Sequence, residues 1–200
     1  MTKVEIKDLI CLAIGSSEMK KSLEEMCHYT YYLKHEREIQ LIINKYLNKH
    51  LKGDRICVCE HQKTDLLVKD HADEKGENGV RIELKYQFWY DRAKPKTKHH
   101  FNGVGEAIRK DLCDRKADIF ILVIYNDDME ESQDGSHWIG KAERHKPKEL
   151  KKQIVARWRK DFSELEGAKI LHQGIRTPTL FSKSTAINFR FMFFVAALHS

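Results

Sequence analysis

The stretch V-R-I-E-L-K-Y-Q-F-W at residues 80–89 begins with a regular alternation of apolar and charged side chains. Successive side chains of a β-strand point to opposite faces, so the alternation predicts a strand with Ile82 and Leu84 on one face. Arg81, Glu83 and Lys85 then share the other face. A carboxylate and an amine two positions apart are thereby expected side by side.

Two short apolar runs with β-branched side chains precede this strand, at residues 55–59 and 65–68, and both are predicted to be strands. Residues 69–79 are polar and end in Asn-Gly, the composition of a hairpin connection. A hairpin here would bring Asp65, at the start of the second run, back towards Glu83.

Residues 3–14 and 18–50 are predicted to be helical, the longer stretch with an interruption, because neither Pro nor Gly occurs from Ser16 to Lys52. The later part carries an apolar stripe formed by Tyr32, Ile39, Ile42, Ile43 and Tyr46. Glu36 lies about 60° from the centre of this stripe at helical spacing. We therefore expect Glu36 to point towards the packed side.

Further along the chain, residues 100–115 have helical spacing, and I-F-I-L-V-I-Y at 119–125 is typical of a strand covered on both faces. A helix at about 147–166 and strands near 168–175 and 186–197 complete the prediction. The expected fold is a mixed α/β domain spanning residues 1–200. Its core would cover about 33–125, with a mixed central sheet flanked by helices.

Composition narrows the class of protein. A chain of 200 residues with 41% hydrophobic content is large enough for one packed domain. Charged residues break up the first apolar positions, so no signal peptide is expected and a cytoplasmic location is predicted. The apolar stretch Phe191–Leu198 is too short to cross a membrane. The five cysteines lack the spacing of a disulfide framework or zinc site, which favours reduced thiols.

Positive charge is concentrated in one segment. Residues 141–160 contain nine Lys or Arg against two Glu, a local balance of +7 in a chain whose formal net charge is +6. Clustered cations favour a polyphosphate partner through counterion release, although a basic helix can also be a solvated face that binds nothing. The residues expected to contact phosphates are Lys151, Lys152, Arg157 and Arg159.

The predicted order of helix, strand, strand, strand, helix and strand, with Asp65 in the second strand and Glu83-Leu84-Lys85 in the third, resembles the PD-(D/E)xK nuclease superfamily. Thr64-Asp65 would match that family's Pro-Asp, with Thr in place of Pro. The family's frequent helical glutamate would fall on Glu36. Acid-x-Lys occurs at five other places in the chain, but all of these lie in predicted helices or loops or at a helix end.

The resemblance implies a restriction-endonuclease-like core and a catalytic centre of Asp65, Glu83, Lys85 and Glu36. Asp65, Glu83 and the main-chain carbonyl of Leu84 would hold Mg²⁺, for which Mn²⁺ could substitute, because carboxylate-bound divalent cations neutralise the charge of phosphodiester cleavage. Lys85 would orient or help to deprotonate the attacking water. Glu36 would polarise Lys85 or bind a second metal ion through water.

The expected function is therefore Mg²⁺-dependent endonuclease cleavage, of DNA in preference to RNA, in a restriction or phage-defence role. Cutting both strands would favour a homodimer. Two alternatives remain open: a nucleic-acid-binding protein that keeps the fold without activity, and a protein-interaction subunit. A purely structural reading of the motif is an exposed hairpin face on which Arg81, Glu83 and Lys85 form ordinary surface ion pairs, each contributing little stability.

Overall fold

The structure is a computed structural model that describes residues 1–29, 36–61, 64–88, 116–127, 166–178 and 186–197. The described part contains three helices and six strands. The helices are α1 (Lys3–Gly15), α2 (Ser17–Tyr29) and α3 (Glu36–His50). The strands are β1 (Arg55–His61), β2 (Thr64–Asp70), β3 (Val80–Phe88), β4 (Ile119–Asp127), β5 (Glu166–Pro178) and β6 (Ala186–Ala197).

The strands form one sheet in the order β1-β2-β3-β4-β6-β5. β3 and β4 are parallel and every other neighbouring pair is antiparallel, so the predicted mixed sheet is confirmed. All six predicted strands coincide with observed ones. The helix predicted at 100–115 lies outside the described residues. The helix predicted at about 147–166 also does, apart from Glu166, which is the first residue of β5.

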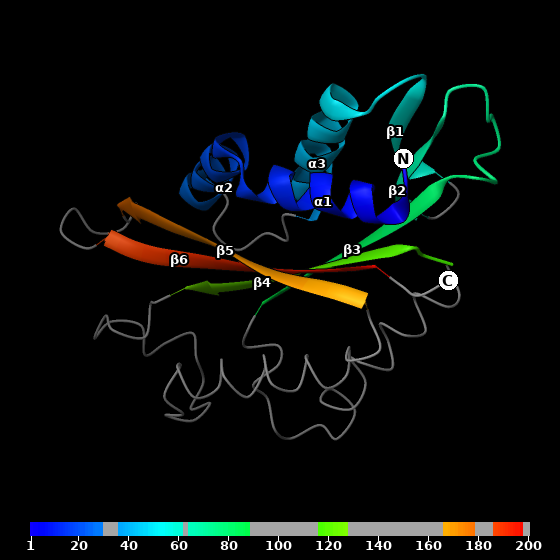
Figure 1. Ribbon diagram of the computed structural model, residues 1–200. Helices are drawn as coiled ribbons and strands as arrows, with labels where there is room; N and C mark the ends of the chain where they lie inside the picture. Colours follow the sequence, from blue (N-terminus) through cyan, green and yellow to red (C-terminus); the bar gives the residue numbers. More distant parts are fainter. Residues whose placement is uncertain (30–35, 62–63, 89–115, 128–165, 179–185, 198–200) are drawn as a thin grey trace.

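The three helices lie together on one face of the sheet (Figure 1). The apolar core forms between this layer and the sheet. Alternate residues of the central strands contribute to it, namely Ile82, Leu84 and Tyr86 of β3 and Ile119, Ile121 and Val123 of β4. The odd-numbered residues of β3 therefore point to the opposite face of the sheet, as the alternation in the sequence predicted.

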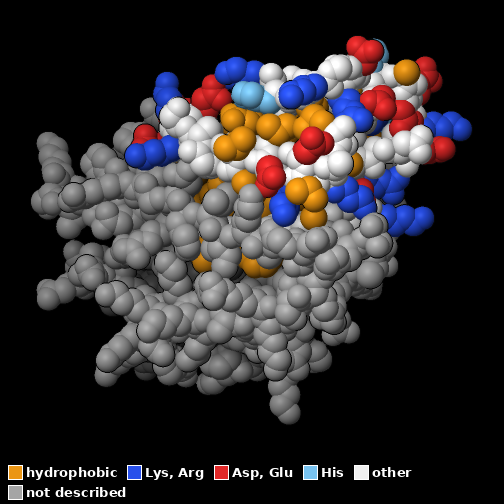
Figure 2. Space-filling model, viewed as in Figure 1, with side chains coloured by type: hydrophobic (Ala, Val, Ile, Leu, Met, Phe, Trp, Pro, Cys, Tyr) orange, Lys and Arg blue, Asp and Glu red, His pale blue; other side chains and the backbone are white. Residues whose placement is uncertain are grey.

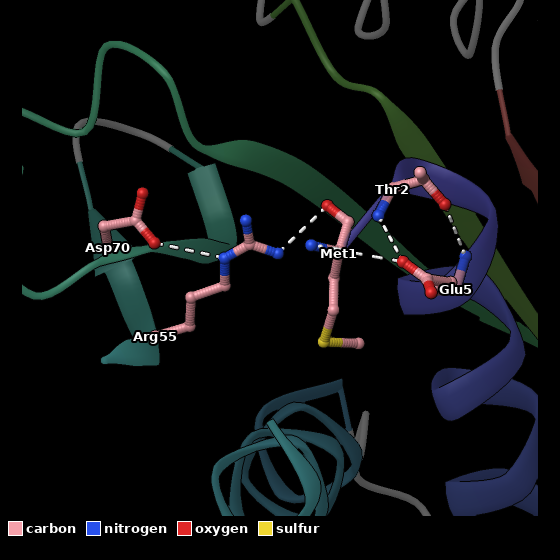
Figure 3. A network of polar contacts seen from close by, with 5 residues as sticks. All are labelled: Met1, Thr2, Glu5, Arg55 and Asp70. Carbon is pink, nitrogen blue, oxygen red and sulfur yellow. Dashed lines mark hydrogen bonds and ion pairs between the residues drawn. The ribbon is translucent and has the colours of Figure 1, made fainter. Parts of the chain in front are cut away.

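A hydrogen bond connects the residues before α1 to β1, the edge strand of the sheet. Thr2 and Glu5 form a capping box, in which each side chain accepts a hydrogen bond from the other's main-chain N–H. Arg55 in β1 donates from Nη1 to the Met1 carbonyl oxygen at 3.0 Å and from Nε to Asp70 Oδ1 at 3.1 Å (Figure 3). The start of α1 is thus connected to both strands of the first hairpin.

Helix α3 packs its buried face against the sheet through Ile39, Gln40, Ile43 and Leu47. This face is rotated from the predicted stripe, because Gln40 and Leu47 are buried while Ile42 and Tyr46 are only half-buried. Further along α3, Asn48 exchanges hydrogen bonds with both the N–H and the carbonyl of Cys57, each at 2.8 Å. An asparagine side chain therefore satisfies main-chain groups on the outer edge of β1.

The four cysteines in the described ranges, Cys11, Cys27, Cys57 and Cys59, are free thiols, as predicted, and Cys113 lies outside these ranges. None of the described helices has the length and apolar character needed to cross a membrane. On the face seen in Figure 2, the described Lys and Arg side chains are interspersed with Asp and Glu, and apolar side chains lie among them.

Candidate active site

The ladder between β2 and β3 ends before β3 does. Its paired residues are Val68–Val80, Leu67–Arg81 and Leu66–Ile82. Beyond Ile82, β3 continues to Phe88 with its other edge paired to β4. At this point the Asp65 side chain takes the place of a main-chain partner, since its Oδ2 accepts a hydrogen bond of 2.7 Å from the Leu84 N–H.

A second carboxylate continues this arrangement. Glu36, in the first turn of α3, accepts a hydrogen bond of 3.0 Å at Oε2 from the Tyr86 N–H. Main-chain groups two residues apart in a strand point to the same edge, so Leu84 and Tyr86 present successive N–H groups to the gap left by β2. Asp65 and Glu36 therefore meet the same edge of β3, and Glu36 points towards the sheet as predicted.

Asp65 and Glu83 share one face of the sheet. Leu66 and Ile82 are paired and both belong to the core beneath the helices. If this register continued by one residue beyond the last pair, Asp65 and Glu83 would oppose each other on the face away from those helices. Glu83 is completely buried at 0% exposure. Removing a carboxyl group from water costs free energy. We therefore expect an interaction or a function to compensate for the burial of Glu83.

Lys85 follows Glu83 on the same face and is half-buried. In the parallel ladder, Glu83 is paired with Phe120 and Lys85 with Leu122, and both β4 side chains are completely buried. The neighbours of these two polar residues on the β4 side are therefore apolar. Low local polarity strengthens the attraction between a carboxylate or ammonium group and an ion of opposite charge.

The Leu84 carbonyl is directed to the same edge as its N–H. On the β4 side, Arg81 donates its N–H to Asp118 Oδ2 at 2.9 Å and accepts from the Asp118 N–H at 2.8 Å. Odd-numbered residues of β3 thus use their main-chain groups towards β4. Even-numbered residues, including Leu84, direct both N–H and carbonyl towards the β2 side, where Asp65 lies.

A series of contacts leads from Asp65 through Gln40 and Arg37 of α3 to Glu60 of β1. Gln40 donates from Nε2 to the main-chain carbonyl of Asp65, and its Oε1 accepts a hydrogen bond of 3.1 Å from Arg37 Nη1. Arg37 also forms an ion pair with Glu60, at the end of β1. None of these three residues was predicted from the sequence. The spacing of Glu36 and Gln40, one helical turn apart, could have indicated Gln40, but nothing local links Arg37 to Glu60.

The donor set is suited to Mg²⁺. No group of three or more His, Cys, Asp or Glu side chains that could hold a metal ion occurs within the described ranges. Mg²⁺, however, commonly retains several waters and binds through only one or two carboxylates. Asp65 and Glu83 supply two carboxylates and Leu84 a main-chain carbonyl, so the kinds of ligand present fit that requirement.

The residues predicted to contact phosphates, Lys151, Lys152, Arg157 and Arg159, lie outside the described residues, and so does the rest of the basic segment at 141–160. The described surface mixes charges of both signs (Figure 2) and has no single basic face in that view.

Comparison of the chain with protein-family models, with curated proteins and with solved structures finds no match.

Proposed function

We propose that this protein is a metal-dependent endonuclease with a restriction-endonuclease-like core. The observation that carries the proposal is the meeting of Asp65 and Glu36 at the edge of β3, next to buried Glu83 and half-buried Lys85. These four side chains come from α3, β2 and β3. Among the described residues, α3, β1, β2, β3 and β4 follow one another as the resemblance implies, and the helix expected between β3 and β4 lies outside these residues.

Each residue has a role that follows from its chemistry. Asp65, Glu83 and the Leu84 carbonyl would hold Mg²⁺, or Mn²⁺ in its place, and the bound ion would neutralise charge on the scissile phosphate. Lys85 would orient the attacking water and donate hydrogen bonds to the phosphate oxygens. Glu36, whose carboxylate is already directed to this edge of β3, would help to orient Lys85.

The proposed substrate is DNA in preference to RNA, and the proposed setting is restriction or phage defence. Lys151, Lys152, Arg157 and Arg159 would supply phosphate contacts outside the described residues. Cutting both strands of a duplex would require two active centres, which favours a homodimer. Replacing the four cations by Ala is expected to lower affinity and flatten its salt dependence.

Cleavage of supercoiled plasmid and of single-stranded DNA, with Mg²⁺ or Mn²⁺ and with EDTA, tests the activity. Wild type should cut only with metal. Asp65→Ala, Glu83→Gln and Lys85→Met should each lower the rate by at least about 100-fold, the usual effect of removing a group that stabilises the transition state. Asp70→Ala is the matched control, because it removes an exposed acid from the other end of β2.

Metal-dependent cutting that survives in Asp65→Ala and Lys85→Met would refute this site. DNA binding without any cutting would instead identify a nucleic-acid-binding protein that lacks activity. A protein that binds no nucleic acid at low salt would be assigned to the third class, the protein-interaction subunits. Urea unfolding of each variant shows whether a lost activity reflects a lost fold.

A further inference from the structure

We propose that Gln40 is a positioning residue that fixes the main chain of Asp65 and thereby aims its carboxylate at the metal. This inference rests on the proposed nuclease site and adds to it a residue that touches neither metal nor substrate. The first two turns of α3 would then have two roles, to carry Glu36 and to hold the main chain of Asp65.

The contacts of Gln40 determine its orientation. Its side chain is buried, at 4% exposure, and both ends of the amide are used. Nε2 donates to the Asp65 carbonyl, and Oε1 accepts from Arg37 Nη1 at 3.1 Å. Because the guanidinium can only donate, it decides which end of the amide faces Asp65. The Arg37–Glu60 ion pair holds the guanidinium in turn.

Asp65 needs such a restraint because the sheet is irregular on both sides of it. Towards β3, the last paired residue of β2 is Leu66, which follows Asp65 in the chain and pairs with Ile82. Towards β1, the paired residues pass from Cys59–Leu66 to His61–Thr64, and Glu60 between them has a φ of 54°. A positive φ is unusual for a residue other than glycine. The bond from Gln40 therefore adds a fixed contact at a residue that neither ladder pairs.

A purely structural role for the amide would be to satisfy the partly buried Asp65 carbonyl, and a measurement of metal affinity distinguishes this role from positioning. Residues that hold a ligand from behind typically change metal affinity by about 10–100-fold when replaced. Gln40→Met keeps the length of the side chain and removes its donor. We expect this variant to raise the Kd for Mn²⁺, measured by titration calorimetry, by roughly 10-fold. The Mg²⁺ concentration for half-maximal plasmid cleavage should rise equally, with kcat largely restored at saturating Mg²⁺.

Asn44→Leu is the matched control. Asn44 lies one turn further along α3 and also donates a side-chain amide to a strand carbonyl, that of Cys57, at 2.8 Å. Its replacement should lower stability without changing the Kd for Mn²⁺. Arg37→Met, which releases the far end of the Gln40 amide, should shift metal affinity in the same direction as Gln40→Met but less. If Gln40→Met does not fold, Arg37→Met supplies the test.

Three outcomes are distinguishable. Weaker Mn²⁺ binding in Gln40→Met with unchanged binding in Asn44→Leu supports the proposal. Wild-type metal affinity and Mg²⁺ dependence in Gln40→Met, while Asp65→Ala loses both binding and cutting, overturns the role of Gln40 and leaves the nuclease site in place. A wild-type protein that neither binds Mn²⁺ nor cuts overturns the nuclease proposal, and the positioning role with it.

Discussion

Buried polar residues gather around Asp65. Among the described residues, four polar or charged side chains are buried, namely Lys7, Gln40, Thr64 and Glu83. Three of these lie near Asp65: Thr64 precedes it, Glu83 follows the residue that pairs with its neighbour Leu66, and Gln40 binds its carbonyl. Burying polar groups costs stability unless they are partnered, so proteins concentrate them where function requires them. Their concentration at one place supports a functional role for this end of β2.

The thiols of Cys27 and Cys57 belong to the core between the helices and the sheet, and their reactivity reports how well this core excludes water. Burial raises the pKa of the Cys27 thiol to about 12, with a smaller contribution from nearby Glu24. Burial also raises the pKa of Cys57 to about 12, although a hydrogen bond with Asn44 opposes part of this effect. The reactive species is the thiolate, so at pH 8 only about one in ten thousand of such thiols is reactive. Both cysteines should resist alkylation.

Iodoacetamide labelling at pH 8, followed by peptide mass spectrometry, checks this expectation. Half-buried Cys11 should be modified well before Cys27 and Cys57, and all should react in urea. The same pKa values predict a sign for stability. Because both are raised above the ordinary 9.0, the stabilisation is complete below pH 9 and is lost as pH rises towards 12. A urea midpoint that rises between pH 8 and pH 10 in wild type relative to Cys57→Ala would contradict this sign.

The connection from β2 to β3 shows how one element sets the register of the site. The Asp73 carboxylate accepts hydrogen bonds from the N–H groups of Asn78, Gly76 and Glu77, which lower its pKa. Gly76 has a φ of 67°, and a Cβ there would lie 2.4 Å from Cδ2 of buried Leu67. The connection therefore folds back onto β2 just before Val80, where the pairing of β3 with β2 begins.

Gly53 and Gly76 both have a positive φ, so replacing each by Ala distinguishes the cost of backbone strain from the cost of steric overlap. Gly53 has a φ of 70° and no atom within 4 Å of an added Cβ. Gly53→Ala should thus cost only the conformational penalty, about 1–2 kcal/mol. Gly76→Ala should cost that plus overpacking against Leu67, about 1–3 kcal/mol more. Urea unfolding measures both, and equal losses in the two variants would show that Leu67 yields to the added methyl group.

Strand β3 and helix α3 illustrate what local patterns can predict. The alternation from Val80 to Lys85 correctly separated core residues from Glu83 and Lys85, because side-chain direction in a strand depends only on the strand itself. Helical spacing similarly directed Glu36 towards the sheet. The contacts of Gln40 with Asp65 and of Arg37 with Glu60 join residues 25 and 23 positions apart. They depend on how α3 crosses the hairpin, which no local pattern specifies.

The termination of the β2–β3 ladder is a property of the whole sheet. β3 leaves β2 after Ile82 but stays paired to β4 along Ile82–Phe88. The apolar run at 119–125 predicted a strand covered on both faces, and its described side chains, Ile119 to Val123, are all at 0% exposure. It did not reveal that this strand would run parallel to β3. That pairing supports β3 along the length where β2 is absent, so the gap at Asp65 depends on the centre of the sheet.

If β4 supports β3 beside this gap, the hydrogen bonds that β4 forms with β3 and β6 should break only when the whole molecule unfolds. Ile121 is paired with Leu84 on one side and Val195 on the other. Its amide should exchange with solvent hydrogen at a free energy equal to that of urea unfolding, about 5–15 kcal/mol for a domain of this size. The Val4 amide, which precedes the first main-chain hydrogen bond of α1, from the Ile6 N–H to the Thr2 carbonyl, serves as the fast reference. Native-state hydrogen exchange in increasing urea measures both. A shallow urea dependence at Ile121 would mean that β4 detaches by itself, and the gap beside Asp65 would then need support from another part of the chain.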